Sequence, residues 1–217
     1  MPVGDSGLAD LRSYPKAFLE NNALVVFGSN AHASGPCQYR LVLTTRKGWK
    51  SVAGSAGERS VPYWFMMRDG VFHPDFDATR SSVAFDVYYV SMREFTNGQW
   101  EDTGTTHFVL PGAAGADMMV TSKLNGCTFG IGMNAAGARM VSHLRPPPNA
   151  QLASTVVPQG LEAGFAGGSI DYRVMSNGAE NGTILGFRAG GNWTFYTQRF
   201  RMRPNTTGLV EMVVKLS

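Results

Sequence analysis

Cys127 and His143 are of the residue types that form a nucleophile and its base, and they lie sixteen positions apart. A cysteine attacks a carbonyl carbon as the thiolate, and an adjacent imidazole can accept the thiol proton. The imidazolium formed in this way can then protonate a leaving amine or ammonia. Side by side, the two residues would support acyl transfer from an amide.

The segment that carries both residues is predicted to be a β-hairpin. CTFGIGM (127–133) alternates as strands do, and ARMVSHL (138–144) follows as a second β-like segment. Between them lies NAAG, in which Gly137 suits the left-handed position of a short loop. We therefore expect a catalytic hairpin over about 120–144.

The length of the hairpin loop decides whether the two side chains meet. If the loop is 134–136, Cys127 lies directly opposite His143. If it is 135–137, Phe129 lies opposite His143 and Cys127 is the diagonal neighbour. Both loops put thiol and imidazole on one sheet face, where directly paired Cβ atoms are about 4.5–5.5 Å apart. A two-residue loop would point them to opposite faces.

A catalytic thiol also needs hydrogen-bond donors for the oxyanion that forms on the attacked carbonyl. Gly126 allows close backbone approach, so the N–H groups near 126–128 are candidate donors. The alternative interpretation is that Cys127 is a small core residue and His143 lies at the rim of the sheet.

The residues around the cysteine form a pattern that resembles the signature of cysteine-dependent glutamine deamidases. This group includes the catalytic domain of cytotoxic necrotizing factors, the Burkholderia lethal factor and the chemotaxis receptor deamidases. The resemblance covers about 25 residues, and its motif is Thr-x3-[Ser/Asn]-Gly-Cys followed by a histidine at the end of the next strand. The matching residues are Thr121, Leu124, Asn125, Gly126, Cys127 and His143.

The resemblance implies a role for each matching residue. Cys127 would be the nucleophile, His143 the base and then the acid, and Thr121 the group that orients the imidazole. Asn125, which stands where toxin members often have serine, would support the oxyanion together with Gly126 and Thr128.

The implied reaction is hydrolysis of a glutamine side chain to glutamate on a target protein, and it needs no cofactor. The expected partner is a host protein of the GTPase or translation-factor class, and the chain would act as a monomer. The expected setting is a bacterial toxin or effector, secreted or injected without a signal peptide into the target-cell cytosol, or otherwise an enzyme of the bacterial cytoplasm.

Two alternatives stay open at this point. The same dyad can serve a cysteine protease or a transglutaminase, since both share the thioester step. The chain can also be a non-catalytic β-sandwich that binds protein or carbohydrate through aromatic side chains. The candidates for such a groove are Trp64, Trp100, Trp193 and Tyr196.

The composition and pattern predict an α+β fold that is rich in strands. Hydrophobic residues make up 43% of the 217 residues and charged residues 16%, which allows a sizeable core. We expect one catalytic domain over 1–217, with an N-terminal helix at about 7–20 and two mixed sheets forming a β-sandwich. Long loops at 47–60 and 145–168, together with 111–118, are the expected walls of the site.

The charge pattern and the motifs speak against several other classes. The net charge is +3 and no basic stripe interleaved with aromatic residues occurs, so we expect no nucleic-acid partner. No apolar window of about 18 residues predicts a membrane span. No cysteine or histidine pair has the spacing of metal ligands, so no metal site is expected.

Overall fold

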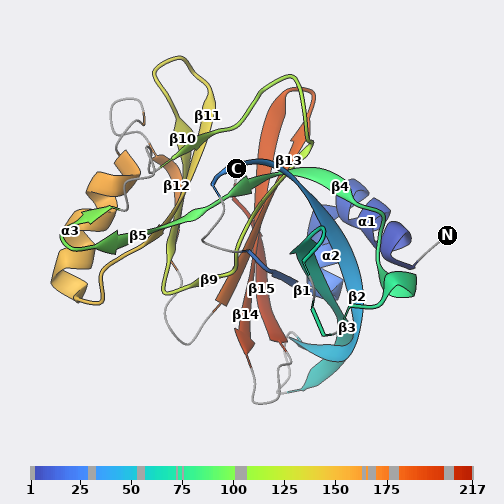
Figure 1. Cartoon of the computed structure of the whole chain (residues 1–217). Coiled ribbons are helices and arrows are strands. Elements are labelled where there is room, and N and C mark those ends of the chain that lie inside the picture. The colour runs from blue at the N-terminus through green and yellow to red at the C-terminus, as the bar shows by residue number, and fades with distance from the viewer. Residues whose placement is uncertain are drawn as a thin grey trace.

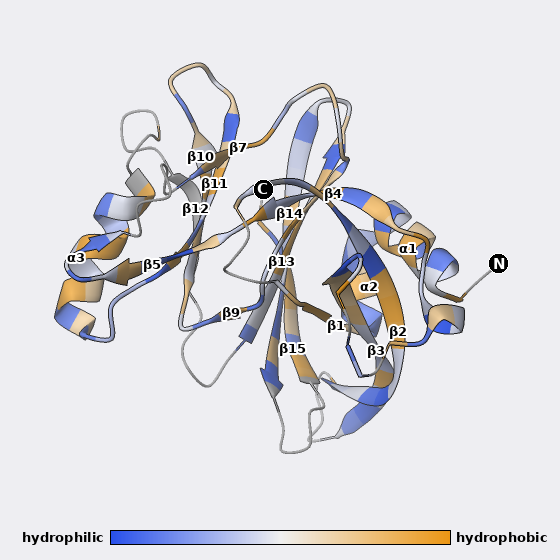
Figure 2. Ribbon diagram, viewed as in Figure 1, coloured by the Kyte–Doolittle hydropathy of each residue, from blue (hydrophilic) through white to orange (hydrophobic). Residues whose placement is uncertain are grey.

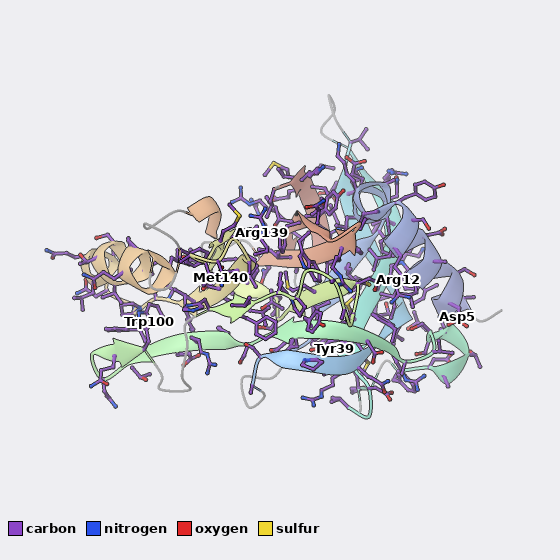
Figure 3. The ribbon with its side chains drawn as sticks, turned by 90° about the horizontal axis from the view of Figure 1, so that it is seen from above. Asp5, Arg12, Tyr39, Trp100, Arg139 and Met140 are labelled. Atoms are coloured by element: carbon purple, nitrogen blue, oxygen red, sulfur yellow. The ribbon has the colours of Figure 1, made fainter. Side chains whose placement is uncertain are left out.

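The computed structural model describes residues 3–28, 33–52, 57–71, 73–74, 76–100, 107–162, 165, 170–175, 181–202 and 208–216. Two mixed β-sheets pack face to face, and helices cover their outer faces (Figure 1). Seen from above in Figure 3, α1 lies at one side of the molecule and α3 at the other, with the sheets between them. The predicted α+β, strand-rich class with two mixed sheets is confirmed.

In the part of the chain that the structure describes, the larger sheet has nine strands. They are β1 (Ala23–Val26), β2 (Gly35–Ser51), β3 (Glu58–Arg68), β4 (Phe85–Val90), β8 (Met118–Thr121), β9 (Leu124–Asn125), β13 (Asn181–Ala189), β14 (Asn192–Met202) and β15 (Gly208–Lys215). The long β2 pairs with β3, β15 and β4, so the sheet bends back on itself along this strand.

The smaller sheet has six strands, and α3 (Ala150–Glu162) packs on its outer face. Its strands are β5 (Met92–Thr96), β6 (Gln99–Trp100), β7 (Phe108–Val109), β10 (Thr128–Met133), β11 (Arg139–Arg145) and β12 (Ile170–Met175). A short 3-10 helix, η1 (Ala78–Arg80), precedes β4.

Among the described residues, four apolar clusters hold the sheets and helices together, and three of them lie between layers. Helices α1 (Val3–Ser13) and α2 (Pro15–Asn21) bury Leu11 and Leu19 against the larger sheet. Between the sheets, Phe129 of β10 packs in one cluster with Phe195 of β14. Leu161 of α3 packs in a separate cluster on the other face of the smaller sheet. Figure 2 shows apolar residues running along the strands, with hydrophilic residues toward the far end of β2 and β3.

The N-terminal segment forms two helices where the sequence predicts one. Pro15 takes the first position of α2, where its missing N–H has no intrahelical partner to lose. The proline therefore starts a second helix instead of interrupting a single one.

The turn of the predicted hairpin has one of the loops expected for it. Phe129 pairs with His143, which is the register of the predicted 135–137 loop. Gly137 has φ +76°, and the Asn134 carboxamide oxygen accepts hydrogen bonds from the backbone N–H groups of Ala136 and Ala138. In the RAGGN turn (188–192), two glycines with positive φ join β13 to β14.

Both long predicted loops are largely regular structure, so these expectations are wrong. In 47–60, β2 runs to Ser51 and β3 begins at Glu58, while 53–56 lie outside the described residues. In 145–168, α3 follows the three prolines. Asn149 accepts hydrogen bonds from the first N–H groups of α3, and Pro158 sits inside the helix. The apolar contacts of α3 with β11 outweigh the proline signal.

Within the described residues, no helix is both long enough and apolar enough to cross a membrane.

Candidate active site

The candidate site lies where two segments cross from the larger sheet to the smaller one. β4 ends at Val90 and β5 begins at Met92 in the other sheet. The chain makes a second crossing between β9 and β10, and Cys127 is the last residue of that crossing. Side chains from both sheets therefore meet at this point.

Thr121 and His143 form a buried hydrogen bond across the two sheets. Thr121 ends β8 in the larger sheet, and its Oγ1 lies 2.6 Å from His143 Nδ1. The same hydroxyl donates to the Val90 carbonyl oxygen at 2.7 Å. A threonine hydroxyl has one proton, so Oγ1 must accept from Nδ1–H. This hydrogen bond assigns the Nδ1–H tautomer and leaves the Nε2 lone pair as the basic site.

The Nε2 atom of His143 is positioned as a proton acceptor. It is buried, and within the described part of the chain no group forms a hydrogen bond with it. A buried polar atom without a partner costs folding free energy, of about 1–3 kcal/mol. Such an atom fits a site in which the missing partner arrives during the reaction.

Cys127 lies on the same sheet face as His143, as its diagonal neighbour in the hairpin. Its Sγ lies 3.5 Å from both the Asn125 carbonyl oxygen and Met92 Sδ, and the single thiol proton can go to either. Diagonal neighbours are about 7–8 Å apart or somewhat closer, which is within reach of an aromatic ring such as the imidazole.

Burial shifts both ionisable groups toward their neutral forms. It lowers the pKa of His143 from 6.5 to about 3. It also raises the pKa of the Cys127 thiol, against smaller lowering effects of the Asn125 backbone and Arg145. The resting pair is therefore a neutral thiol and a neutral imidazole, and proton transfer must accompany attack.

A pocket of about 390 Å³ opens over the cysteine. Cys127 and Met92 line it, whereas His143 is not among its lining residues and is 1% exposed. The charged residues of its lining are Lys123 and Arg145, and Arg145 pairs with Glu94 at 2.9 Å.

The three residues expected to support the oxyanion lie in different places. Gly126 has φ +68°, a backbone conformation that favours glycine, directly before Cys127. Asn125 lines the pocket, and its carbonyl oxygen contacts the thiol. The Thr128 side chain alternates away from Cys127 and shares its face with Leu144, which packs against α3. Its side chain therefore does not reach the site, and the expected support by Thr128 stays a prediction that concerns its backbone N–H.

The comparisons with known proteins give little guidance. No protein-family model matches the sequence, and no curated protein matches it. Among solved structures, the chain is similar to the C-terminal domain of CNFy from Yersinia pseudotuberculosis. That likeness covers 99% of each chain at 9% identity, with a TM-score of 0.40. We therefore base the function proposed below on the side-chain geometry.

The walls of the pocket differ from those expected. Val26, Phe27 and Gly28 line it, together with residues of the β8–β10 connection. Of the expected walls at 47–60, 111–118 and 145–168, only Arg145 is among the described lining residues. Helix α3, which forms most of the described part of 145–168, covers the outer face of the smaller sheet instead.

The four aromatic residues of the binding-module alternative do not form a shared groove. Trp64 and Trp193 are buried, and their indole N–H groups donate to Asn22 and to the Pro111 carbonyl oxygen. Trp100 packs against the α3 cluster, and Tyr196 packs against the helix side of the larger sheet. Trp64 and Tyr196 belong to one cluster, whereas Trp193 and Trp100 belong to two others, and all four serve as packing residues.

Met92 also belongs to the site, although the sequence did not predict it as a site residue. It pairs with His143 across β5 and β11 and contacts the thiol. The sequence segment 82–92 reads as one strand, so the change of sheet at Ser91 has no clear local signal.

We expect Met92→Leu to increase the alkylation rate of Cys127 by iodoacetamide about two- to fivefold. The leucine removes one weak acceptor of the thiol proton, worth about 0.5–1 kcal/mol, at nearly constant volume. Rates measured by intact mass would check this. In a His143→Ala background, Met92→Leu should no longer increase the alkylation rate. An equal increase in that background would contradict the role of Nε2.

The depressed pKa of His143 predicts a loss of stability in acid. The unfolded imidazole has a pKa of about 6.5, so between about pH 6.5 and pH 3 the unfolded chain binds a proton that the folded chain does not. The contribution of the neutral, buried His143 to the free energy of unfolding is fully present above about pH 6.5. Below that pH it falls by about 1.4 kcal/mol per pH unit. From pH 7 to pH 5 the wild type should lose about 2 kcal/mol more than His143→Gln. Urea unfolding of both proteins measures this, and parallel losses would refute the prediction.

Proposed function

We propose that the chain is a cysteine-dependent amidohydrolase that deamidates glutamine side chains of a protein. One observation carries this proposal: the Thr121 hydroxyl, committed to the Val90 carbonyl, leaves the Nε2 lone pair free on His143, which shares a sheet face with Cys127. A nucleophile, a base and a group that orients the base are the parts that thioester chemistry requires.

The reaction follows from these groups without a cofactor. Nε2 takes the thiol proton as Sγ attacks the amide carbon, and the oxyanion is stabilised by nearby N–H groups. The tetrahedral intermediate collapses, the C–N bond breaks, and ammonia leaves with the proton from His143. Water then gives a proton to Nε2 and attacks the thioester, and the C–S bond breaks. Glutamate is released, and the proton returns to the thiolate.

The depth of the thiol favours a side-chain amide as the substrate. Cys127 is 3% exposed and lies at the pocket wall. A glutamine side chain carries its amide on a flexible two-methylene tether that can enter such a pocket. A main-chain peptide would have to bring its whole backbone to the same depth.

The setting of the reaction follows from the motif around Cys127. We propose a bacterial toxin or effector whose partner is a host protein with the target glutamine, in the GTPase or translation-factor class. Delivery by a route independent of a signal peptide, action as a monomer in the target-cell cytosol, and the roles of Cys127, His143 and Thr121 are parts of the same proposal.

Incubation of the purified chain with a eukaryotic cell lysate tests the proposal, with ammonia release and intact mass as readouts. A specific protein should gain about one mass unit, the change from amide to acid. The gain should be absent with Cys127→Ala and with His143→Ala. Cleaved products would instead indicate a protease, and mass gains that depend on an added amine would indicate a transglutaminase. No change in any lysate would refute the deamidase function.

A further inference from the structure

A second pocket adjoins the one over Cys127. It has a volume of about 230 Å³, and it shares Phe27 and Gly28 with the cysteine pocket. The two hollows therefore lie on either side of the chain that follows β1. A polypeptide that places one side chain over Cys127 has the second pocket within reach of a neighbouring side chain.

The lining of this second pocket is mainly apolar. Besides Phe27 and Gly28, it is formed by Tyr39, Met67, Arg68, Val71 and His73. The rings of Phe27 and His73 lie 5.0 Å apart, and both contact Phe65. The hydroxyl of Tyr39, a residue of β2 that is labelled in Figure 3, donates to the Phe27 carbonyl oxygen and so helps to fix the wall that the two pockets share.

The size of the pocket suits one large side chain. Its volume equals roughly eight times the volume of one water molecule in the liquid. At its mouth, Val71 is 51% exposed, which is unfavourable for an apolar residue unless another apolar group covers it. A leucine, methionine or phenylalanine side chain would fill such a space.

The charged side chains that line the two pockets are basic, and one of them, Arg145, is paired with Glu94. Arg68 lines the apolar pocket, and Lys123 and Arg145 line the cysteine pocket. Among the described lining residues of these two pockets, none is a carboxylate. The nearby Asp69 is held by Arg40 in an ion pair. A substrate segment with acidic residues matches this field, and a basic segment would be repelled.

We propose that the apolar pocket is a specificity subsite for the substrate protein. It receives a large apolar side chain close in sequence to the target glutamine, and Arg68 pairs with an acidic residue of the same segment. This inference rests on the proposed function, because it assumes that a protein glutamine enters the cysteine pocket.

A peptide library provides the test. Its members carry one fixed glutamine with randomised residues on both sides, and mass spectrometry identifies the peptides that the chain deamidates. The wild type should enrich peptides with a large apolar residue at one fixed distance from the glutamine and with Asp or Glu nearby. Val71→Gln should lower the apolar enrichment about tenfold, by the loss of apolar contact. Arg68→Glu should replace the preference for acidic residues by one for basic residues.

Val83→Gln is the matched control. Val83 is exposed to 62% and lines neither pocket, so this variant should keep the wild-type preferences. Thermal unfolding of each variant ensures that only folded protein is compared. Deamidation without sequence preference, or with preferences that Val71→Gln and Arg68→Glu leave unchanged, would overturn the subsite and keep the proposed function. No deamidation by the wild type in either the library or the lysates would overturn both.

Discussion

Cys127→Ala is expected to lower deamidation at least about a thousandfold, because no other group can form the thioester. The fold should persist, since the change removes one sulfur atom from a buried position at a cost of about 1 kcal/mol. Ammonia release at saturating substrate, with thermal unfolding measured in parallel, checks both parts.

Cys37→Ala is the matched control for that variant. Cys37 is the other free cysteine, it lies on β2, and it lines neither of the two pockets near the site. This variant should retain wild-type turnover. If Cys127→Ala kept turnover while Cys37→Ala lost it, the nucleophile would have been assigned to the wrong cysteine.

Thr121→Val should have the second-largest effect, on both stability and turnover. Valine has nearly the shape of threonine, but it leaves His143 Nδ1–H and the Val90 carbonyl oxygen without their partner. Two buried polar groups without partners cost about 2–4 kcal/mol together. The tautomer that exposes the Nε2 lone pair is no longer held, so turnover should fall about 10²- to 10⁴-fold.

Thr121→Ser keeps the hydroxyl and separates orientation from packing. It should retain turnover within about tenfold of the wild type, because Oγ can still bridge Nδ1 and the Val90 carbonyl oxygen. Turnover must be measured well below the midpoint of unfolding and divided by the concentration of folded chain. If Thr121→Val then matched the wild type per folded molecule, Thr121 would be a packing residue and not a positioning residue.

Sequence reasoning succeeded where the interaction is local. Gly137 indicated a short loop, of which two odd-length versions and a two-residue version were open, and the structure has one of the odd-length versions. That loop puts Cys127 and His143 on one face. The segment 145–168 was predicted as a loop, because prolines before and inside it are local signals against a helix. The helix α3 forms there because Val157 and Leu161 are buried against β11, which is a tertiary contact.

The parts of the site that come from distant segments of the chain were harder to predict from the sequence. The pairing of Met92 with His143 depends on the parallel contact of β5 with β11, which no short stretch of sequence indicates. Phe27 and Gly28 reach the pocket from the end of β1, about a hundred residues before the cysteine. Thr121 was named only through the resemblance around Cys127, and its bond to Nδ1 requires both sheets to be in place.

The crossing of the chain between the sheets also bears on when catalytic competence arises during folding. The smaller sheet alone contains His143 but lacks the threonine that selects its tautomer, which belongs to the larger sheet. An intermediate with either sheet unformed would have a thiol and no oriented base. Recovery of activity after dilution from denaturant should therefore report the docking of the two sheets. Partly folded chains should be inactive.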